Sequence, residues 1–362
     1  MQTALSGFNM FDKILFLFLV LSPLCYQAKQ DLFIFADRFL MMGTVLLGSF
    51  CLLFYKPKRV LLPKWPVWLL IFSIYKLYTL PYHPLSMHAV LNILFGIGIF
   101  YLVTCFAEDI RWLYRAVGVV VLVNAIYVIS QMAGFSPIFT SQSLSGFFVN
   151  NSDLAGYLVL AMPLCAGFGK GTGFFLPLIL AGFLQSYTAI ICGAISGFLI
   201  TVRRGLYPLL TILIVGICVL GFMKQSFSPL YKIKYRFLHW KAVVETALMR
   251  PVAGNGLGRA IEVTANAQGG GWFNAKNEYL EFGWEVGILP ALVFIIYLFR
   301  ELILRYRKAI KSWDLTLISI SLLSFALAMI VQSHLRNPKI APTVMAVLGF
   351  FYVLTEKQKE EI

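Results

Sequence analysis

Residues 87–107 read MHAVLNILFGIGIFYLVTCFA, an apolar run that contains no Lys, Arg, Asp or Glu. A helix needs about 20 predominantly apolar residues to cross the hydrocarbon core of a bilayer, and this run is long enough. Similar apolar runs recur from Ile14 to Leu354. The run therefore predicts a membrane-spanning helix, and its recurrence predicts many such helices.

The composition of the whole chain agrees with this interpretation. Of its 362 residues, 59% are hydrophobic and only 13% are charged, which is roughly half the charged share of soluble domains. So few charged side chains cannot cover that much apolar surface in water. A soluble enzyme, a secreted disulfide scaffold and a disordered chain are excluded, and an all-α polytopic integral membrane protein is predicted.

About twelve spans are predicted, with one large polar loop before the tenth. The first follows Lys13 and resembles a signal-peptide core, but it lacks an A-x-A cleavage site, so we interpret it as a retained helix. The predicted regions are residues 1–223 with about nine spans, the loop 224–283, and residues 284–362 with about three spans and a short tail. The spans lie near residues 13–28, 36–55, 66–81, 87–107, 113–133, 147–168, 172–187, 189–202, 206–223, 283–299, 314–332 and 339–355.

Thirty Lys and Arg residues against sixteen Asp and Glu give a formal charge of +14. Basic loops mark the cytoplasmic side of a membrane, and every second predicted loop is basic. This pattern places both termini in the cytoplasm and residues 224–283 outside it, and it accounts for the charge without a nucleic-acid partner. The basic positions are Lys56, Lys58, Arg59, Lys64, Arg111, Arg115, Lys170, Arg203, Arg204, the cluster 300–311, Lys357 and Lys359.

The outer loop is itself basic, with eight Lys or Arg against four Glu between residues 224 and 283. Two interpretations stay open: a solvated loop that touches anionic headgroups, or a platform that binds an anion. Within the loop, Arg236–Met249 has the spacing of an amphipathic helix, and Arg236 falls on the same stripe as Trp240 and Val243. An arginine that faces the membrane body needs an anionic partner.

The loop leads into the predicted tenth span through Asn277, Glu281 and Glu285, which are spaced i, i+4, i+8. This polar stripe should face a protein interior or an aqueous cavity, where the two carboxylates either pair with arginines or serve a substrate. Lys276 stands beside the expected helix N-terminus, a position suited to phosphate because free N–H groups would add to its charge. A lysine that faces lipid headgroups is the alternative.

A second polar group lies at the outer end of the sixth span. Asn150, Asn151 and Asp153 either cap that helix or bind sugar hydroxyls. No metal or cofactor is predicted, since the six cysteines stand singly and H-E-x-x-H, D-x-D and P-loop patterns are absent. His334 and Arg336, in the last outer loop, are interpreted as incidental.

Four segments in order resemble the O-antigen ligase/polymerase family of membrane glycosyltransferases. They resemble the family's N-x-N-x-x-A-x-x-L, S-R-G-A, R-x-x-x-W with P-x-x-G-x-G-x-G, and H-N-x-Y-L-x-x-x-x-E-x-G patterns, over about the last 220 residues. Two positions depart from the family: Ala194, Ile195 and Ser196 stand where an arginine is usual, and Lys276 replaces a histidine. The segments begin at Phe148, Cys192, Arg236 and Asn277.

The resemblance implies metal-independent transfer of a polyprenyl-diphosphate-linked glycan to a sugar hydroxyl, at the outer face of a bacterial cytoplasmic (inner) membrane. The acceptor would be another glycan or lipid A core, with membrane lipids around the protein. Lys276 and Glu281 are the catalytic candidates, with Lys276 as a cation that is not expected to take a proton. The substrate-binding candidates are Arg236, Asn277, Asn151, Asp153 and Arg250.

Three classes of function remain distinguishable. A polymerase is preferred over a ligase, because family polymerases vary more and the family arginine is missing here. A transporter or lipid flippase is the rival class, with Asp37, Arg38 and Lys76 as candidate intramembrane charges, although no repeat of two halves is visible. A structural membrane subunit would leave the basic outer loop without a purpose.

Overall fold

The computed structural model describes residues 8–24, 34–54, 57, 63–79, 84–135, 145–148, 150–204, 229–259, 276–309, 311–331, 335, 337 and 339–357. Every regular element in these residues is a helix, which confirms the all-α prediction for them. The helices are α1 (Phe8–Leu24), α2 (Ile34–Phe54), α3 (Lys64–Thr79), α4 (Pro84–Phe106), α5 (Arg111–Met132), α6 (Asn151–Cys165), η1 (Gly169–Phe174), α7 (Phe175–Phe183), α8 (Tyr187–Arg204), α10 (Pro229–Leu248), α12 (Glu278–Val286), α13 (Ile288–Lys308), α14 (Trp313–Ala328) and α15 (Ala341–Lys357).

Two helices in the described part of the chain are long and apolar enough to cross a bilayer, over Ala89–Phe106 and Arg111–Met132. Several others are apolar but shorter, among them α14 and α15. The count of twelve spans therefore stays a prediction. The ninth predicted span, residues 206–223, lies outside the described residues.

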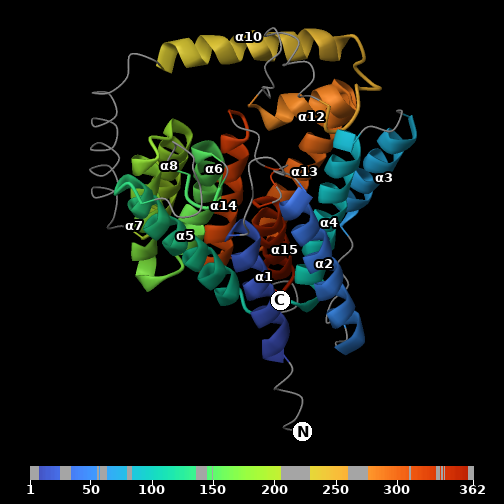
Figure 1. The fold of residues 1–362 in the computed structure, drawn as a ribbon. Helices are drawn as coiled ribbons and strands as arrows, with labels where there is room; N and C mark the ends of the chain where they lie inside the picture. The colour runs from blue at the N-terminus through green and yellow to red at the C-terminus, as the bar shows by residue number, and fades with distance from the viewer. Residues whose placement is uncertain are drawn as a thin grey trace.

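The helices pack side by side into a bundle, with α10 lying across one end and α12 beneath it (Figure 1). Within the bundle α14 packs against α6 and α8, and α15 packs against α4. Buried hydroxyl groups join the inner helices: Ser321 Oγ donates to the Leu160 carbonyl over 2.6 Å, and Ser196 Oγ lies 2.6 Å from Ser324 Oγ. These contacts let small side chains bring α6, α8 and α14 close together.

The polar stripe 277–285 does not open one long helix, as the sequence predicted. The chain breaks at Gly287, whose φ of 103° is a left-handed conformation that favours glycine. Pro290 then stands in the first turn of α13, where a missing N–H costs nothing. Glu281 therefore lies in the short helix α12, with Asn277 as its N-cap and Lys276 just before it, and the long helix α13 begins only after Gly287.

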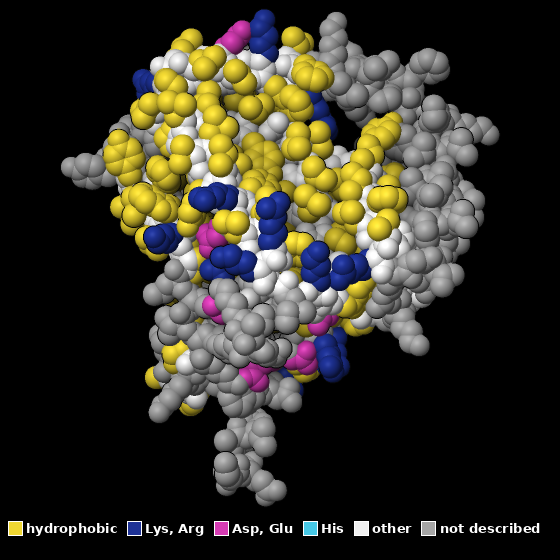
Figure 2. All heavy atoms as spheres, turned by 180° about the vertical axis from the view of Figure 1, so that it is seen from behind, with side chains coloured by type: hydrophobic (Ala, Val, Ile, Leu, Met, Phe, Trp, Pro, Cys, Tyr) yellow, Lys and Arg dark blue, Asp and Glu magenta, His cyan; other side chains and the backbone are white. Residues whose placement is uncertain are grey.

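The surface of the described residues carries many large apolar side chains. Leu46, Leu53, Ile126 and Val293 are each at least 50% exposed. Figure 2 shows a broad apolar surface below α10 that is bordered on its other side by a row of Lys and Arg side chains. An exposed apolar area of this extent is unusual for a monomeric soluble protein and marks contact with a partner or a membrane.

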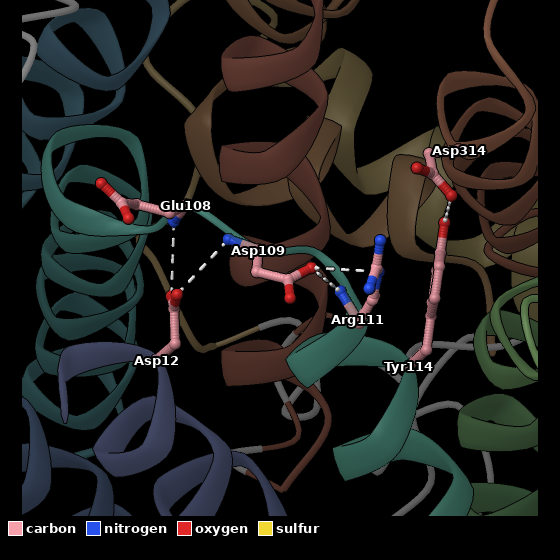
Figure 3. A network of polar contacts seen from close by, with 6 residues as sticks. All are labelled: Asp12, Glu108, Asp109, Arg111, Tyr114 and Asp314. Carbon is pink, nitrogen blue, oxygen red and sulfur yellow. Dashed lines mark hydrogen bonds and ion pairs between the residues drawn. The ribbon is translucent and has the colours of Figure 1, made fainter. Parts of the chain in front are cut away.

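Asp12 fixes the start of α5 at the end of the bundle opposite α10 (Figure 3). Its carboxylate is buried and accepts backbone N–H bonds from Glu108 and Asp109, each over 3.3 Å. Nearby, the Tyr114 hydroxyl donates to Asp314 over 3.0 Å and so links α5 to α14. A buried carboxylate is tolerated here because the backbone amides satisfy it.

We expect Asp12→Ala to lower stability by about 1 kcal/mol, because it leaves two partly buried N–H groups without their acceptor. Lys13→Ala is the matched control, since Lys13 is exposed on the same helix. Thermal unfolding of the purified proteins measures the difference. Equal melting temperatures for the two variants would contradict the role given to Asp12.

Candidate functional site

The first turn of α12 is fastened to the end of α14. Asn277 caps the helix, because its Oδ1 accepts the Leu280 N–H over 3.0 Å. The Glu278 N–H donates to the Met329 carbonyl over 2.9 Å, and the Tyr279 hydroxyl donates to the Ala326 carbonyl over 2.9 Å. The role of Asn277 in the structure is thus that of a helix cap.

These bonds correct one expectation about phosphate binding. The sequence predicts free N–H groups at the start of this helix. In the structure the N–H groups of Glu278 and Leu280 both have acceptors within the protein. Glu278 is buried in the same turn, and its Oε2 accepts the Leu335 N–H over 3.3 Å. Neither of these two N–H groups is therefore available to an anion.

The glycine-rich segment after α10 is hydrogen-bonded to the other end of α12. The Asn255 N–H donates to the Trp284 carbonyl and the Gly256 N–H to the Glu285 carbonyl, each over 3.0 Å. Gly254 has a φ of 63°, and a Cβ there would collide with the Glu285 carbonyl. The P-x-x-G-x-G-x-G pattern consequently serves a close approach of two backbones.

Helix α10 docks on α12 through the stripe that the sequence predicted. Val243 and Ala247 are buried against Trp284, whose Nε1 donates to Thr246 Oγ1 over 2.9 Å. Arg236 lies on this stripe and is partly buried, and burial lowers the pKa of its guanidinium from the usual value. Lys241 and Glu245 are exposed on the opposite side of the helix, with Lys241 Nζ 3.7 Å from Glu245 Oε1.

The docking register brings the N-terminal parts of both helices to the same side. Figure 1 shows α10 and α12 running in the same direction across the end of the bundle. Counting back from the Thr246–Trp284 contact at about 1.5 Å per residue gives roughly 15 Å to Arg236 in α10 and roughly 9 Å to Glu278, the first residue of α12, which Lys276 precedes by two positions. The two cations proposed for one anion therefore lie toward the same end of the α10–α12 contact.

Asp153 is the centre of a second polar group, which we call the Asp153 cluster: Asn150, Asp153, Lys276, Asn337 and Lys339. Asn150 caps α6 by accepting the Asp153 N–H over 2.8 Å, and its Nδ2 donates to Asp153 Oδ2 over 2.9 Å. The Asn337 side chain also bonds to Asp153, and the charges of Lys276 and Lys339 both act on it. Three segments far apart in sequence meet here.

Asn337 and Lys339 are the members that sequence reasoning missed, and Lys339 is the more unusual of the two. Its side chain is only 1% exposed, its Nζ donates to the Phe147 carbonyl over 2.6 Å, and it lies 5.6 Å from the centre of the Phe148 ring. A lysine is seldom buried so completely without partners. In the sequence it follows Pro338 in a short loop, and only the loop's position between two apolar helices could have drawn attention to it.

The structure joins some of the predicted residues and separates others. Lys276 lies within electrostatic range of Asp153 and has a left-handed φ of 55°, a strained conformation for a lysine. Glu281 is buried in α12, whereas Asn151 is exposed at the start of α6. Arg250 is exposed beside the C-terminal end of α12, away from Lys276. His334 and Arg336 lie outside the described residues.

The position where the family pattern places an arginine is neutral here. Ser196 is buried and shares a hydrogen bond with Ser324, so this part of α8 serves helix packing. Among the described residues, no group of three or more His, Cys, Asp or Glu is arranged to hold a metal ion. Comparisons with models of known protein families and with curated proteins find no match to this chain.

We expect Gly254→Ala to destabilise the α10–α12 contact, because the added Cβ meets the backbone of Glu285 and Gly287. Gly134→Ala is the control: Gly134 also has a positive φ, but its Cβ would meet no described atom. The control should lose about 1–2 kcal/mol for the conformation alone, and Gly254→Ala should lose more. Thermal unfolding of both variants measures the loss of stability. Equal losses in the two variants would contradict the close approach of the two backbones at Gly254.

Proposed function

We propose that the chain is a polytopic membrane protein of about twelve spans, with both termini in the cytoplasm and α10 and α12 on the outer side. The apolar surface bordered by a row of Lys and Arg supports this proposal, since basic side chains gather at the cytoplasmic edge of a membrane protein (Figure 2). The exposed apolar side chains on α2, α5 and α13 support it too. A bacterial cytoplasmic membrane is the location that the family resemblance implies.

Labelling of single cysteines tests this topology. In a background without the six native cysteines, Glu245→Cys on α10 should react with a membrane-impermeant maleimide in intact cells. Lys308→Cys, at the exposed end of α13, should react only after the cells are opened. The reverse pattern would invert the topology and remove the site from the outer side.

The reaction that we propose is transfer of a polyprenyl-diphosphate-linked glycan to an acceptor sugar hydroxyl, as in a polysaccharide polymerase. One observation carries the proposal: Arg236, on the docked face of α10, lies toward the same end of the α10–α12 contact as Lys276. Two cationic side chains can neutralise the charge that grows on a leaving diphosphate, which stabilises the transition state without a metal ion. Lys276 is partly exposed, so it can contact a bound diphosphate.

Arginine and lysine differ in how they bind a diphosphate. The guanidinium is planar and donates two parallel hydrogen bonds, whereas an ammonium group is a point charge. Arg236 also keeps its charge when half-buried, since a guanidinium is protonated throughout the physiological range. This combination makes Arg236 the residue that orients the donor, with Lys276 adding charge beside it.

We expect Arg236→Lys to lose most of the transfer rate while protein level stays normal. Lys241→Gln is the control, because Lys241 is exposed on the opposite face of α10 and should be dispensable for transfer. Purified protein in lipid, supplied with a lipid-linked repeat unit and excess EDTA, should build longer glycan chains. A near-normal rate in Arg236→Lys would place the diphosphate elsewhere.

The products distinguish the remaining functions. Chains that lengthen identify a polymerase, and transfer to lipid A core alone identifies a ligase. Movement of the lipid-linked donor across the bilayer without any transfer would overturn the proposal in favour of a flippase. A glycan transfer rate that vanishes in EDTA and returns with magnesium would count against a clamp made of protein cations.

A further inference from the structure

We propose that Asp153 accepts the proton of the attacking sugar hydroxyl. The inference rests on the proposed glycosyl transfer and assigns the proton acceptor that Lys276, as a cation, does not provide. Asp153 lies within electrostatic range of Lys276, the residue that we place at the leaving diphosphate. A carboxylate in that position can reach the acceptor oxygen while the donor is bound.

The orientation of the Asp153 carboxylate is fixed from two sides. Asn150 Nδ2 donates to its Oδ2 over 2.9 Å, and the Asn337 side chain bonds to it from the loop before α15. Lys339 adds a buried positive charge that cannot move away, because its Nζ is held by the Phe147 carbonyl over 2.6 Å. Lys339 is therefore a positioning residue, whose positive charge favours the ionised form of the carboxylate.

The Asp153 side chain is more exposed than the carboxylates of α12. Glu281 and Glu285 are 2% and 1% exposed, and Glu278 already holds the Leu335 N–H with its Oε2. Asp153 is partly exposed at the first turn of α6. Of these four carboxylates it is the most exposed, and we assign the proton acceptor to it for that reason.

The proposed transfer step forms one bond and breaks another. The acceptor oxygen forms a bond to the anomeric carbon of the donor, and the bond from that carbon to the phosphate oxygen breaks. The electron pair of the broken bond stays on the diphosphate, whose charge Arg236 and Lys276 neutralise. The proton of the acceptor hydroxyl passes to Asp153 and then to water, so no metal or redox partner takes part.

The test removes the carboxylate and then supplies it from solution. Asp153→Ala should bind the polyprenyl-diphosphate-linked donor as the wild type does, yet lose transfer by about 100-fold or more. Formate added to this variant should restore the rate in proportion to its concentration. Glu245→Gln, a carboxylate change on the exposed face of α10, should leave the rate unchanged.

A structural role for Asp153 predicts a different result. Lost activity that formate does not restore, in a variant that melts like the wild type and binds donor, would overturn the inference. If Asp153→Ala does not fold, Asp153→Asn decides: donor binding with a 100-fold loss supports the proton acceptor, and a rate within tenfold of the wild type overturns it. Wild-type protein that binds donor but transfers no glycan would overturn the proposed function as well.

Discussion

The hydrogen bonds that seat α12 on the end of α14 determine the geometry of the whole candidate site. The Glu278 N–H and the Tyr279 hydroxyl hold the first turn, while the backbone of Asn255 and Gly256 holds the last. A helix of nine residues cannot keep its place through its own backbone bonds, so these external bonds decide where it lies. Trp284 then offers the surface on which α10 docks.

Neutralisation of buried charge is the second constraint, and it links α6, α12 and the loop before α15. Lys339 enters the interior with a full charge, which would cost several kcal/mol without compensation. The Phe147 carbonyl, the Phe148 ring and the charge of Asp153 compensate it together. The same contacts bring Asp153 beside Lys276, so stability and the proposed chemistry depend on one set of side chains.

The proposed clamp differs from the pattern of the family that the sequence resembles. The buried Ser196–Ser324 pair occupies the position of one family arginine, and two N–H groups at the start of α12 are already bonded. The positive charge available to a diphosphate therefore comes from Arg236 and Lys276. A clamp of two flexible side chains depends on α10 staying docked, which gives the Thr246–Trp284 bond an importance for function beyond stability.

Local spacing by itself determined the helical class and the amphipathic stripe of α10 with Arg236 on it, whereas it left capping or sugar binding open for Asn150. These features depend on residues within a few turns of each other, so periodicity and side-chain type are enough to predict them. The break between α12 and α13 had a local signal in Gly287 and Pro290, but the polar stripe 277–285 obscured it. Only the tertiary structure decided that Lys276, Asp153 and Lys339 meet, because the pattern within a helix does not determine which helix ends pack together. The burial of Lys339 follows from that packing, and no neighbouring residue in the sequence indicates it.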